Sequence, residues 1–180
     1  MSELLNIVDE NDEIIGVAAR TEIHEKGHLH REVSIQFITK NNEIILQHRG
    51  KNKDLSPDLL SAAVAGHVVV GDSYEETAIK EIVEETGLMV DGSELIFIHK
   101  VNKLSNDISG KVNHVFQARY LYIYDGDIND LKVEAEESEG FEVWPIDSLL
   151  NLNEADKKKF VPSLLHFVSN GLAQIIKDLK

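Results

Sequence analysis

Residues 66–88 read GHVVVGDSYEETAIKEIVEETGL, and this stretch predicts one helix that follows a glycine-rich turn. A helix turns by about 100° per residue, so Glu81, Glu84 and Glu85 fall within an arc of about 100°. The apolar residues between positions 78 and 83 occupy the neighbouring arc, which the protein can bury. We therefore expect a helix that packs on the core and carries an acidic edge.

Both ends of this helix are marked in the sequence. Ser73 and Glu76 have the spacing of a capping box, in which each side chain accepts a hydrogen bond from the other residue's free backbone amide. Gly87 follows the last turn and favours the left-handed conformation that ends a helix. The acidic residues are thus expected on a single rigid element.

Three carboxylates on one helix edge predict a site for a divalent metal ion. They repel one another unless a cation neutralises them, and such hard oxygen ligands suit Mg²⁺ or Mn²⁺ better than zinc. Acidic residues are also common on exposed helix faces, so a solvated surface is the alternative for an isolated cluster. The flanking glycines favour the metal site.

The same stretch resembles the Nudix box, a motif written G-x5-E-x7-R-E-U-x-E-E-x-G-U, where U is a bulky aliphatic residue. Two positions depart from the motif, because Asp72 stands where the family has Glu and Lys80 where it has Arg. Both keep their charge, but Lys cannot reproduce the planar, two-pronged geometry of Arg. The matching residues are Gly66, Glu81, Ile82, Glu84, Glu85, Gly87 and Leu88.

The resemblance implies an α/β fold, the Nudix-type α/β/α sandwich with a mixed β-sheet. It also implies an enzyme acting on phosphorus-containing acid anhydrides, which hydrolyses a nucleoside diphosphate linked to another moiety and uses Mg²⁺ or Mn²⁺. By the same resemblance Glu81, Glu84 and Glu85 are catalytic metal ligands, and the Gly66 carbonyl is a further ligand. Metal ions lower the pKa of bound water and stabilise charge on a leaving phosphate, so no protein nucleophile is required.

Composition limits the partners of such an enzyme. The chain has 180 residues and a formal net charge of -14, from 18 basic and 32 acidic side chains. This charge opposes binding to DNA or RNA, which depends on Lys and Arg displacing counterions. A small-molecule nucleotide or diphosphate substrate remains compatible, because bound metal reverses the local charge.

Features that the sequence lacks exclude further kinds of site and protein. The chain contains no cysteine, which excludes disulfides and thiolate zinc sites. No run approaches the roughly 20 apolar residues of a membrane span, and the first residues lack the basic and apolar regions of a signal peptide. We expect a cytoplasmic protein with no membrane partner.

Strand-like segments dominate the rest of the chain and are separated by polar turns, as in hairpins. Pro162 favours a helix start, and the apolar stripe after it is most simply core packing. With no repeat or linker, residues 1–180 are expected to form a single Nudix hydrolase domain. The expected strands are residues 4–8, 13–18, 33–39, 43–47, 95–101, 112–124 and 142–145, and a helix is expected at 146–150.

Residues 27–31, 44–49, Lys53 and 61–67 resemble the Nudix branch that includes the isopentenyl-diphosphate isomerases, which raises isomerisation as an alternative. Those isomerases carry a Cys directly before the Gly-His pair and two glutamates on a later strand. This chain has Ala65 at the first position and no carboxylate near residues 111–114. Moving a proton between two faces of a double bond requires an acid and a base, so hydrolysis is the preferred prediction.

Four histidines lie where these isomerases use histidines, namely His24, His28, His30 and His67. Without acidic or thiol partners in register, we interpret each as a hydrogen-bonded structural histidine or a substrate contact. They are not included among the predicted metal ligands.

Three further residues are candidates outside the box. The resemblance places Arg49 and Lys53 near the cleft, where either side chain can hold substrate phosphate, although simple surface charge is the alternative. Nudix enzymes often recruit a glutamate from another loop, and Glu137 is chosen here as catalytic general base, with Glu139 as the other choice.

A third class of function is a non-catalytic nucleotide-binding Nudix protein. Such regulators usually carry a DNA-binding domain, for which this chain has neither the length nor the basic charge. Retention of all three box glutamates also favours catalysis. The box does not identify the substrate, and a homodimer is compatible with the sequence.

Overall fold

The computed structural model describes residues 3–53, 56–106, 112–135, 138–172 and 175, and these form a mixed α/β structure. The strands are β1 (Leu4–Val8), β2 (Ile14–Ala19), β3 (Leu29–Ile38), β4 (Glu43–Arg49), β5 (Leu60–Ser61), β6 (Val64–His67), β7 (Ile96–Asn106), β8 (Val112–Ile123) and β9 (Ser138–Pro145). The helices are α1 (Arg20–Lys26), α2 (Tyr74–Thr86), α3 (Ile146–Leu150), α4 (Glu154–Lys157) and α5 (Pro162–Phe167), with short helical turns η1 (Gly92–Glu94), η2 (Ile128–Asp130) and η3 (Val168–Leu172).

Internal contacts divide the chain into two compact units, each built from three segments. The first unit comprises residues 1–35, 64–84 and 88–121, and the second comprises residues 36–63, 85–87 and 122–180. Strands β3 and β8 and helix α2 run from one unit into the other. The single domain over residues 1–180 stays a prediction, and the two units are described in turn.

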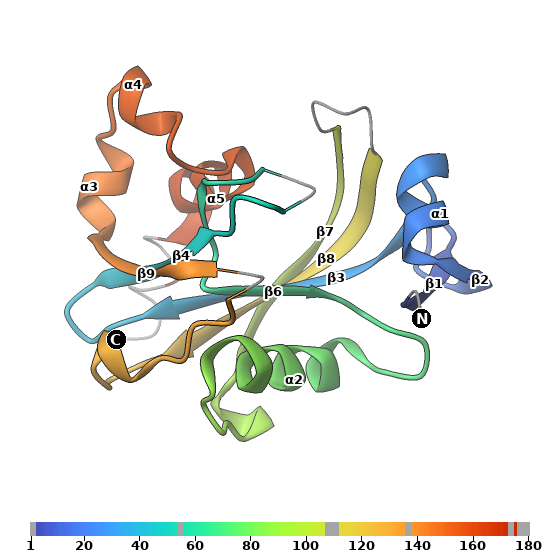
Figure 1. The fold of residues 1–180 in the computed structure, drawn as a ribbon, viewed down its shortest axis with the longest axis horizontal. Coiled ribbons are helices and arrows are strands. Elements are labelled where there is room, and N and C mark those ends of the chain that lie inside the picture. The colour runs from blue at the N-terminus through green and yellow to red at the C-terminus, as the bar shows by residue number, and fades with distance from the viewer. Residues whose placement is uncertain (1–2, 54–55, 107–111, 136–137, 173–174, 176–180) are drawn as a thin grey trace. The chain divides into compact units, whose positions relative to one another are not determined.

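The first unit begins with the predicted hairpin. β1 and β2 pair antiparallel, with Leu5 opposite Ala18, and their turn is held by the Asp9 side chain, which accepts hydrogen bonds from the backbone amides of residues 11 and 13. Helix α1, beside this hairpin in Figure 1, was not predicted from the sequence. Its Ile23 is fully buried against Leu5 and Ala18, so α1 closes a small apolar core at the N-terminal end of the unit.

Asp12 anchors this hairpin to the remainder of the first unit. It has a left-handed backbone with φ of 66° and accepts hydrogen bonds from Arg31 Nε at 2.7 Å, from the Tyr74 hydroxyl at 3.0 Å and from Lys100 Nζ. The Arg31 guanidinium and the Lys100 ammonium lie 5.5 Å and 5.4 Å from the Tyr74 ring centre. Burial and the neighbouring Asp12 charge raise the pKa of Tyr74, which remains a hydroxyl donor at neutral pH.

Longer strands complete the first unit. β3 pairs antiparallel with β6, and β7 pairs with β8 in the long hairpin of Figure 1, from Ile96 opposite Leu121 to Asn106 opposite Val112. The strands predicted at 95–101 and 112–124 are confirmed, although β7 continues to Asn106. Cross-strand pairing extends β7 beyond its apolar part, because backbone hydrogen bonds do not depend on side-chain polarity.

The second unit is centred on β4, which pairs antiparallel with β5, with β9 and with the end of β3. An isolated parallel bridge joins Leu60 to Phe160, so the sheet is mixed as expected. The strand predicted at 142–145 is confirmed as the second half of β9, and the helix at 146–150 is confirmed as α3.

The segment after Pro162 forms helix α5 and then a π-helical turn, η3. Leu164, Val168 and Leu172 are buried, which confirms that this part of the stripe belongs to the core, whereas Ile176 and Leu179 of the predicted stripe lie outside the described residues. Within the part of the chain that the structure describes, no helix is long and apolar enough to cross a membrane. The cytoplasmic location and the homodimer stay predictions.

Candidate functional site

Gly66 and Glu81, two of the predicted metal-binding residues, lie directly against each other. Gly66 is in β6, opposite Val33 of β3, and Glu81 projects from α2. A Cβ atom at position 66 would fall 1.9 Å from Glu81 Oε1 and 2.1 Å from its Cδ. Only glycine leaves room for this carboxylate, so the glycine of the box is required by the position of the first glutamate.

The two departures from the box form a pair of their own. Lys80 Nζ lies 2.6 Å from Asp72 Oδ2, so the shorter acid and the unforked cation still meet at the start of α2. The predicted capping box is confirmed, because the Ser73 amide donates to Glu76 at 2.8 Å and the Glu76 amide donates to Ser73 Oγ at 3.2 Å. Charge and cap together fix where the helix begins.

Glu85 is the most buried of the box glutamates, with 3% of its surface exposed, and it is counted with the second unit. Gln47 of β4, which is 4% exposed, donates a hydrogen bond from Nε2 to Glu85 Oε2. A buried carboxylate with a dedicated amide donor is held in one orientation. Sequence analysis included Gln47 only within the stretch 44–49 and gave it no role of its own, and in the strand it directly follows three apolar residues.

The remaining predicted residues have different surroundings. Glu84 is exposed on α2. Arg49, half-buried at the end of β4, donates from Nε to the Ser56 carbonyl at 3.1 Å, and the Lys53 amide donates to the Gly50 carbonyl at 3.2 Å. The roles of Arg49 and Lys53 in substrate binding stay predictions, and Glu137 lies outside the described residues.

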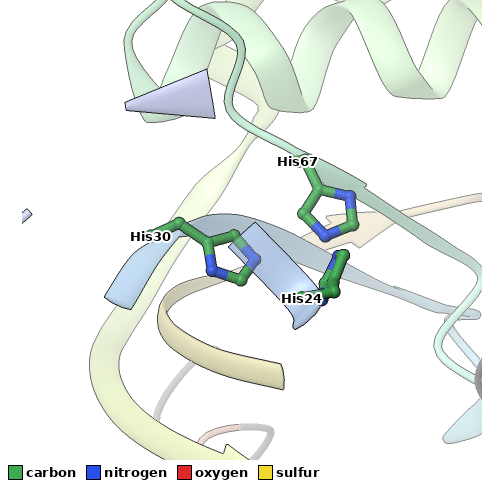
Figure 2. Close-up of side chains that lie close together, drawn as sticks. All are labelled: His24, His30 and His67. Atoms are coloured by element: carbon green, nitrogen blue, oxygen red, sulfur yellow. The ribbon is translucent and has the colours of Figure 1, made fainter. Parts of the chain in front are cut away.

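Three histidines of the first unit come together in a cluster, shown in Figure 2. His24 comes from α1, His30 from β3 and His67 from β6, and their candidate ligand atoms all lie within 4.8 Å of one another. The ring centres are 5.1 to 5.2 Å apart. His28 does not join them, but its carbonyl contacts His30 Nδ1 at 2.9 Å. The interpretation of these histidines as separate structural residues was therefore incomplete.

The hydrogen bonds around this histidine cluster suit a metal ion. Nδ1 of His30 lies against the His28 carbonyl, and Nδ1 of His24 lies 3.2 Å from the Val112 carbonyl, so both must carry a proton there. Nε2 of His30 and Nε2 of His67 are buried without a hydrogen-bond partner. Imidazoles oriented by carbonyls through one nitrogen, with the other nitrogen unprotonated, are the usual arrangement of metal-binding histidines.

Electrostatics favours the neutral rings that metal binding needs. Burial lowers the pKa of His30 to about 4. The contact with the His28 carbonyl opposes this shift. Burial also lowers the pKa of His67 well below its usual range, although the negative charge of Glu32 opposes this shift. At neutral pH both rings are uncharged, and the Nε2 lone pairs are available to a cation.

Glu32 of β3 is the acidic neighbour of the histidine cluster. Its carboxylate accepts a hydrogen bond from Asn113 Nδ2 at 3.1 Å and another from Gln117 Nε2 at 2.5 Å. Burial opposes its ionisation, but the charge of Lys103 and the hydrogen bonds from the two amides lower its pKa below the usual value. The carboxylate beside the histidine cluster therefore comes from β3, two residues from His30.

Two aromatic side chains, Tyr74 and Trp144, have different surroundings. Tyr74 is engaged by Asp12, whereas Trp144 is half-buried and lines a cavity of about 410 Å³ in the second unit. The Trp144 ring packs edge-on against Phe160, with ring centres 5.1 Å apart. His48 and Lys158 also line this cavity, which gives it both an aromatic and a polar wall.

Comparisons with known proteins agree with this geometry. The model of the NUDIX domain matches residues 28–164. An isopentenyl-diphosphate Delta-isomerase of Photorhabdus laumondii is 34% identical over 121 residues, which cover 67% of this chain and 68% of the isomerase. A prenyl-diphosphate phosphatase of Methanosarcina mazei is 25% identical over 175 residues, covering 97% of this chain and 96% of that protein.

A crystal structure from Deinococcus radiodurans matches with a TM-score of 0.74 and 22% identity, and the match covers 92% of this chain and 97% of that one. At this identity the likeness shows the fold. The family model extends over most of the chain and includes the box, the Gly66–Glu81 contact and the histidines at 30 and 67. The chain therefore belongs to the Nudix domain family, in the neighbourhood of its isopentenyl-diphosphate isomerase branch.

Proposed function

We propose that this Nudix hydrolase cleaves a diphosphate bond with the help of Mg²⁺ or Mn²⁺ bound to the box residues. The observation that carries this proposal is the Glu81 carboxylate lying against Gly66, where no side chain other than hydrogen fits. Together, the Glu81 carboxylate and the Gly66 backbone carbonyl offer oxygen ligands to one hard cation. Glu84 and Glu85 are one turn further along the same helix and supply the additional oxygens.

A divalent ion at these residues supplies Lewis acidity, lowers the pKa of water and neutralises phosphate charge. The chain's own residues position it. Gln47 holds one oxygen of Glu85, and the Lys80–Asp72 pair secures the start of α2. In the reaction, the oxygen of water bonds to one phosphorus while the bond from that phosphorus to the bridging oxygen breaks. The bridging oxygen leaves with the second phosphate, and the water proton passes to a carboxylate and then to solvent.

The first candidate substrate is a nucleoside diphosphate linked to another moiety. The resemblance of the box supports it, as does the cavity beside Trp144, because an aromatic face can stack on a nucleobase. Arg49 and Lys53 are proposed to hold phosphate, the former through its forked hydrogen bonds. This substrate class requires no contribution from the histidine cluster.

The second candidate is a prenyl diphosphate, which the histidine cluster favours. We propose that His24, His30 and His67 form a second metal centre, separate from the box, because their ligand atoms lie within 4.8 Å of one another. The buried Nε2 atoms of His30 and His67 have no hydrogen-bond partner, which suits a metal that binds imidazole, such as zinc. The names of the phosphatase and isomerase relatives support diphosphates of this kind. Isomerisation is less favoured, because the alanine at position 65 offers no acid or base.

Phosphate release from two substrate panels separates these possibilities. The first panel contains nucleoside di- and triphosphates, nucleotide sugars and dinucleotides, and the second contains prenyl diphosphates. Each substrate is tested with Mg²⁺ or Mn²⁺. Isomerisation of isopentenyl diphosphate is measured in parallel. Turnover of one panel that is lost in Glu85→Gln establishes hydrolysis at the box and names the class. Normal activity of Glu85→Gln under saturating Mg²⁺ contradicts the placement of the site, and isomerisation without hydrolysis contradicts the reaction.

A further inference from the structure

Glu32 faces the same side of the β3–β6 strand pair as two of the clustered histidines. Residues two apart on a strand project from the same face, so His30 and Glu32 are neighbours along β3. Glu32 is directly opposite His67 in the antiparallel pairing of β3 with β6. Side chains of directly opposed residues also share a face and stand about 5 Å apart at their Cβ atoms. The carboxylate therefore adjoins the histidine cluster by the register of the strands alone.

A chain of buried amides holds this carboxylate in place. Asn113 donates to one oxygen of Glu32, Gln117 donates to the other, and Arg119 Nε in turn donates to Gln117 Oε1 at 2.9 Å. Asn113, Gln117 and Arg119 are 4%, 5% and 6% exposed. They alternate along β8, so all three project toward the same side. A buried polar network of this kind is costly unless every member is satisfied, and it fixes the Glu32 charge at one point.

The histidine cluster needs such a charge to hold a metal ion. Three neutral imidazoles contribute lone pairs but no charge, so a divalent cation among them would be buried with two uncompensated positive charges. The positive Arg20 also acts on His67, whereas the negative Glu32 acts on both His30 and His67. A fixed anion beside the rings offsets part of the cost of burying the cation.

We propose that Glu32 is the fixed counter-charge of the histidine cluster and raises its affinity for a divalent cation. This inference rests on the metal centre proposed above for His24, His30 and His67. Glu32 acts through position and charge rather than as a ligand, since the ligand atoms that lie within 4.8 Å of one another come from the three histidines and not from Glu32. Glu32 is therefore a positioning residue. It lies on β3, the strand that also carries His30.

Glu32→Gln is the appropriate variant, because it removes the charge and keeps the size of the side chain. Its new amide needs an acceptor, and Asn113 Oδ1 is a buried oxygen with no hydrogen-bond partner. Turning the Asn113 amide over presents that oxygen to the new donor, so the network can be restored without the charge. Glu22→Gln is the matched control, since Glu22 is an acid on the helix that carries His24, its side chain is 45% exposed, and it pairs with Lys26 at 2.6 Å.

The experiment titrates metal-free protein with Co²⁺ and follows the visible absorption that imidazole coordination produces, with calorimetry for the affinity. We expect wild type and Glu22→Gln to bind equally, and Glu32→Gln to bind about 10- to 100-fold more weakly, the range for partners that support metal ligands. Glu32→Asp, which keeps the charge, should retain more affinity than Glu32→Gln. Circular dichroism confirms folding, and if Glu32→Gln does not fold, Glu32→Asp and Gln117→Met replace it, with an intermediate loss expected.

Two further variants separate failure of this inference from failure of the metal centre. The Co²⁺ signal should vanish in His30→Gln and persist in Glu85→Gln, which places the ion at the histidines rather than at the box. If that pattern holds and Glu32→Gln binds as tightly as wild type, the counter-charge role is overturned and the metal centre stands. If His30→Gln leaves the signal unchanged, the metal centre and the role of Glu32 are both wrong, while hydrolysis at the box is unaffected.

Discussion

Replacing Gly66 with alanine tests the contact on which the proposed hydrolysis depends. The backbone at residue 66 is outside the left-handed region, so alanine meets no conformational barrier there. The added Cβ would fall 1.9 Å from Glu81 Oε1, whereas real Cβ contacts are essentially never shorter than 3.0 Å. The Glu81 carboxylate must therefore retreat by about 1 Å.

This displacement determines the expected loss. Moving a catalytic group by about 1 Å can lower turnover about 100-fold. Glu81 is half-buried, so its side chain has limited room, and overpacking of this kind costs about 1–3 kcal/mol of unfolding free energy. We therefore expect a folded protein with a much reduced kcat rather than an unfolded one.

The assay combines Mg²⁺-dependent phosphate release with urea unfolding. Gly16→Ala in β2 is the control, because its Cβ would approach nothing closer than 3.7 Å, and it should retain full activity. In a Glu81→Ala background the added methyl meets no carboxylate, so Gly66→Ala should then cost less than about 0.5 kcal/mol. A Gly66→Ala protein whose kcat stays within about threefold of wild type, roughly 0.7 kcal/mol of barrier, would refute the proposed Gly66–Glu81 geometry.

Three other predictions follow from the buried polar groups. Gln47→Leu removes the amide donor to Glu85. We expect kcat to fall about 10-fold and the free energy of unfolding in urea to fall by about 1–3 kcal/mol. An unchanged kcat contradicts the positioning role of Gln47. His30 has a folded pKa of about 4 against an ordinary 6.5, so metal-free protein should keep this stabilisation, about 3 kcal/mol, above pH 6.5 and lose it as the pH falls toward 4. In urea titrations at pH 7.5 and pH 5, His30→Gln should flatten this dependence, and an equal slope in both proteins counts against it. Tyr74→Phe removes a hydroxyl donor to Asp12 and should cost about 1 kcal/mol with unchanged kcat; a large loss of kcat would assign Tyr74 to the site.

Local sequence signals predicted the elements whose stability is local. The capping box of Ser73 and Glu76 and the left-handed Gly87, with φ of 73°, specify both ends of α2 within a few residues. Turn residues likewise specified the first hairpin. Helix α1 was missed because it is seven residues long, has no side-chain N-cap and buries only Ile23 and His24. Its helicity comes from packing on the hairpin rather than from a periodic apolar pattern.

The position of the box glutamates on one helix edge could be predicted because one helix carries them all, and helix geometry converts spacing into position. The sequence alone thus determined the Nudix family, the acidic helix edge and the paired departures at residues 72 and 80. Each of these depends on residues within one continuous stretch, 66–88.

The tertiary structure decided what depends on distant segments. His24, His30 and His67 come from a helix and two strands, and no local spacing shows that their rings meet. Likewise, the register of β3 against β6, together with the amides of β8, puts the Glu32 carboxylate beside them. Strand register is set by the pairing of whole strands, and a shift of one residue would turn Glu32 to the opposite face. For this reason the acidic helix can be predicted from the sequence, whereas the histidine cluster and its counter-charge can be recognised only in the folded chain.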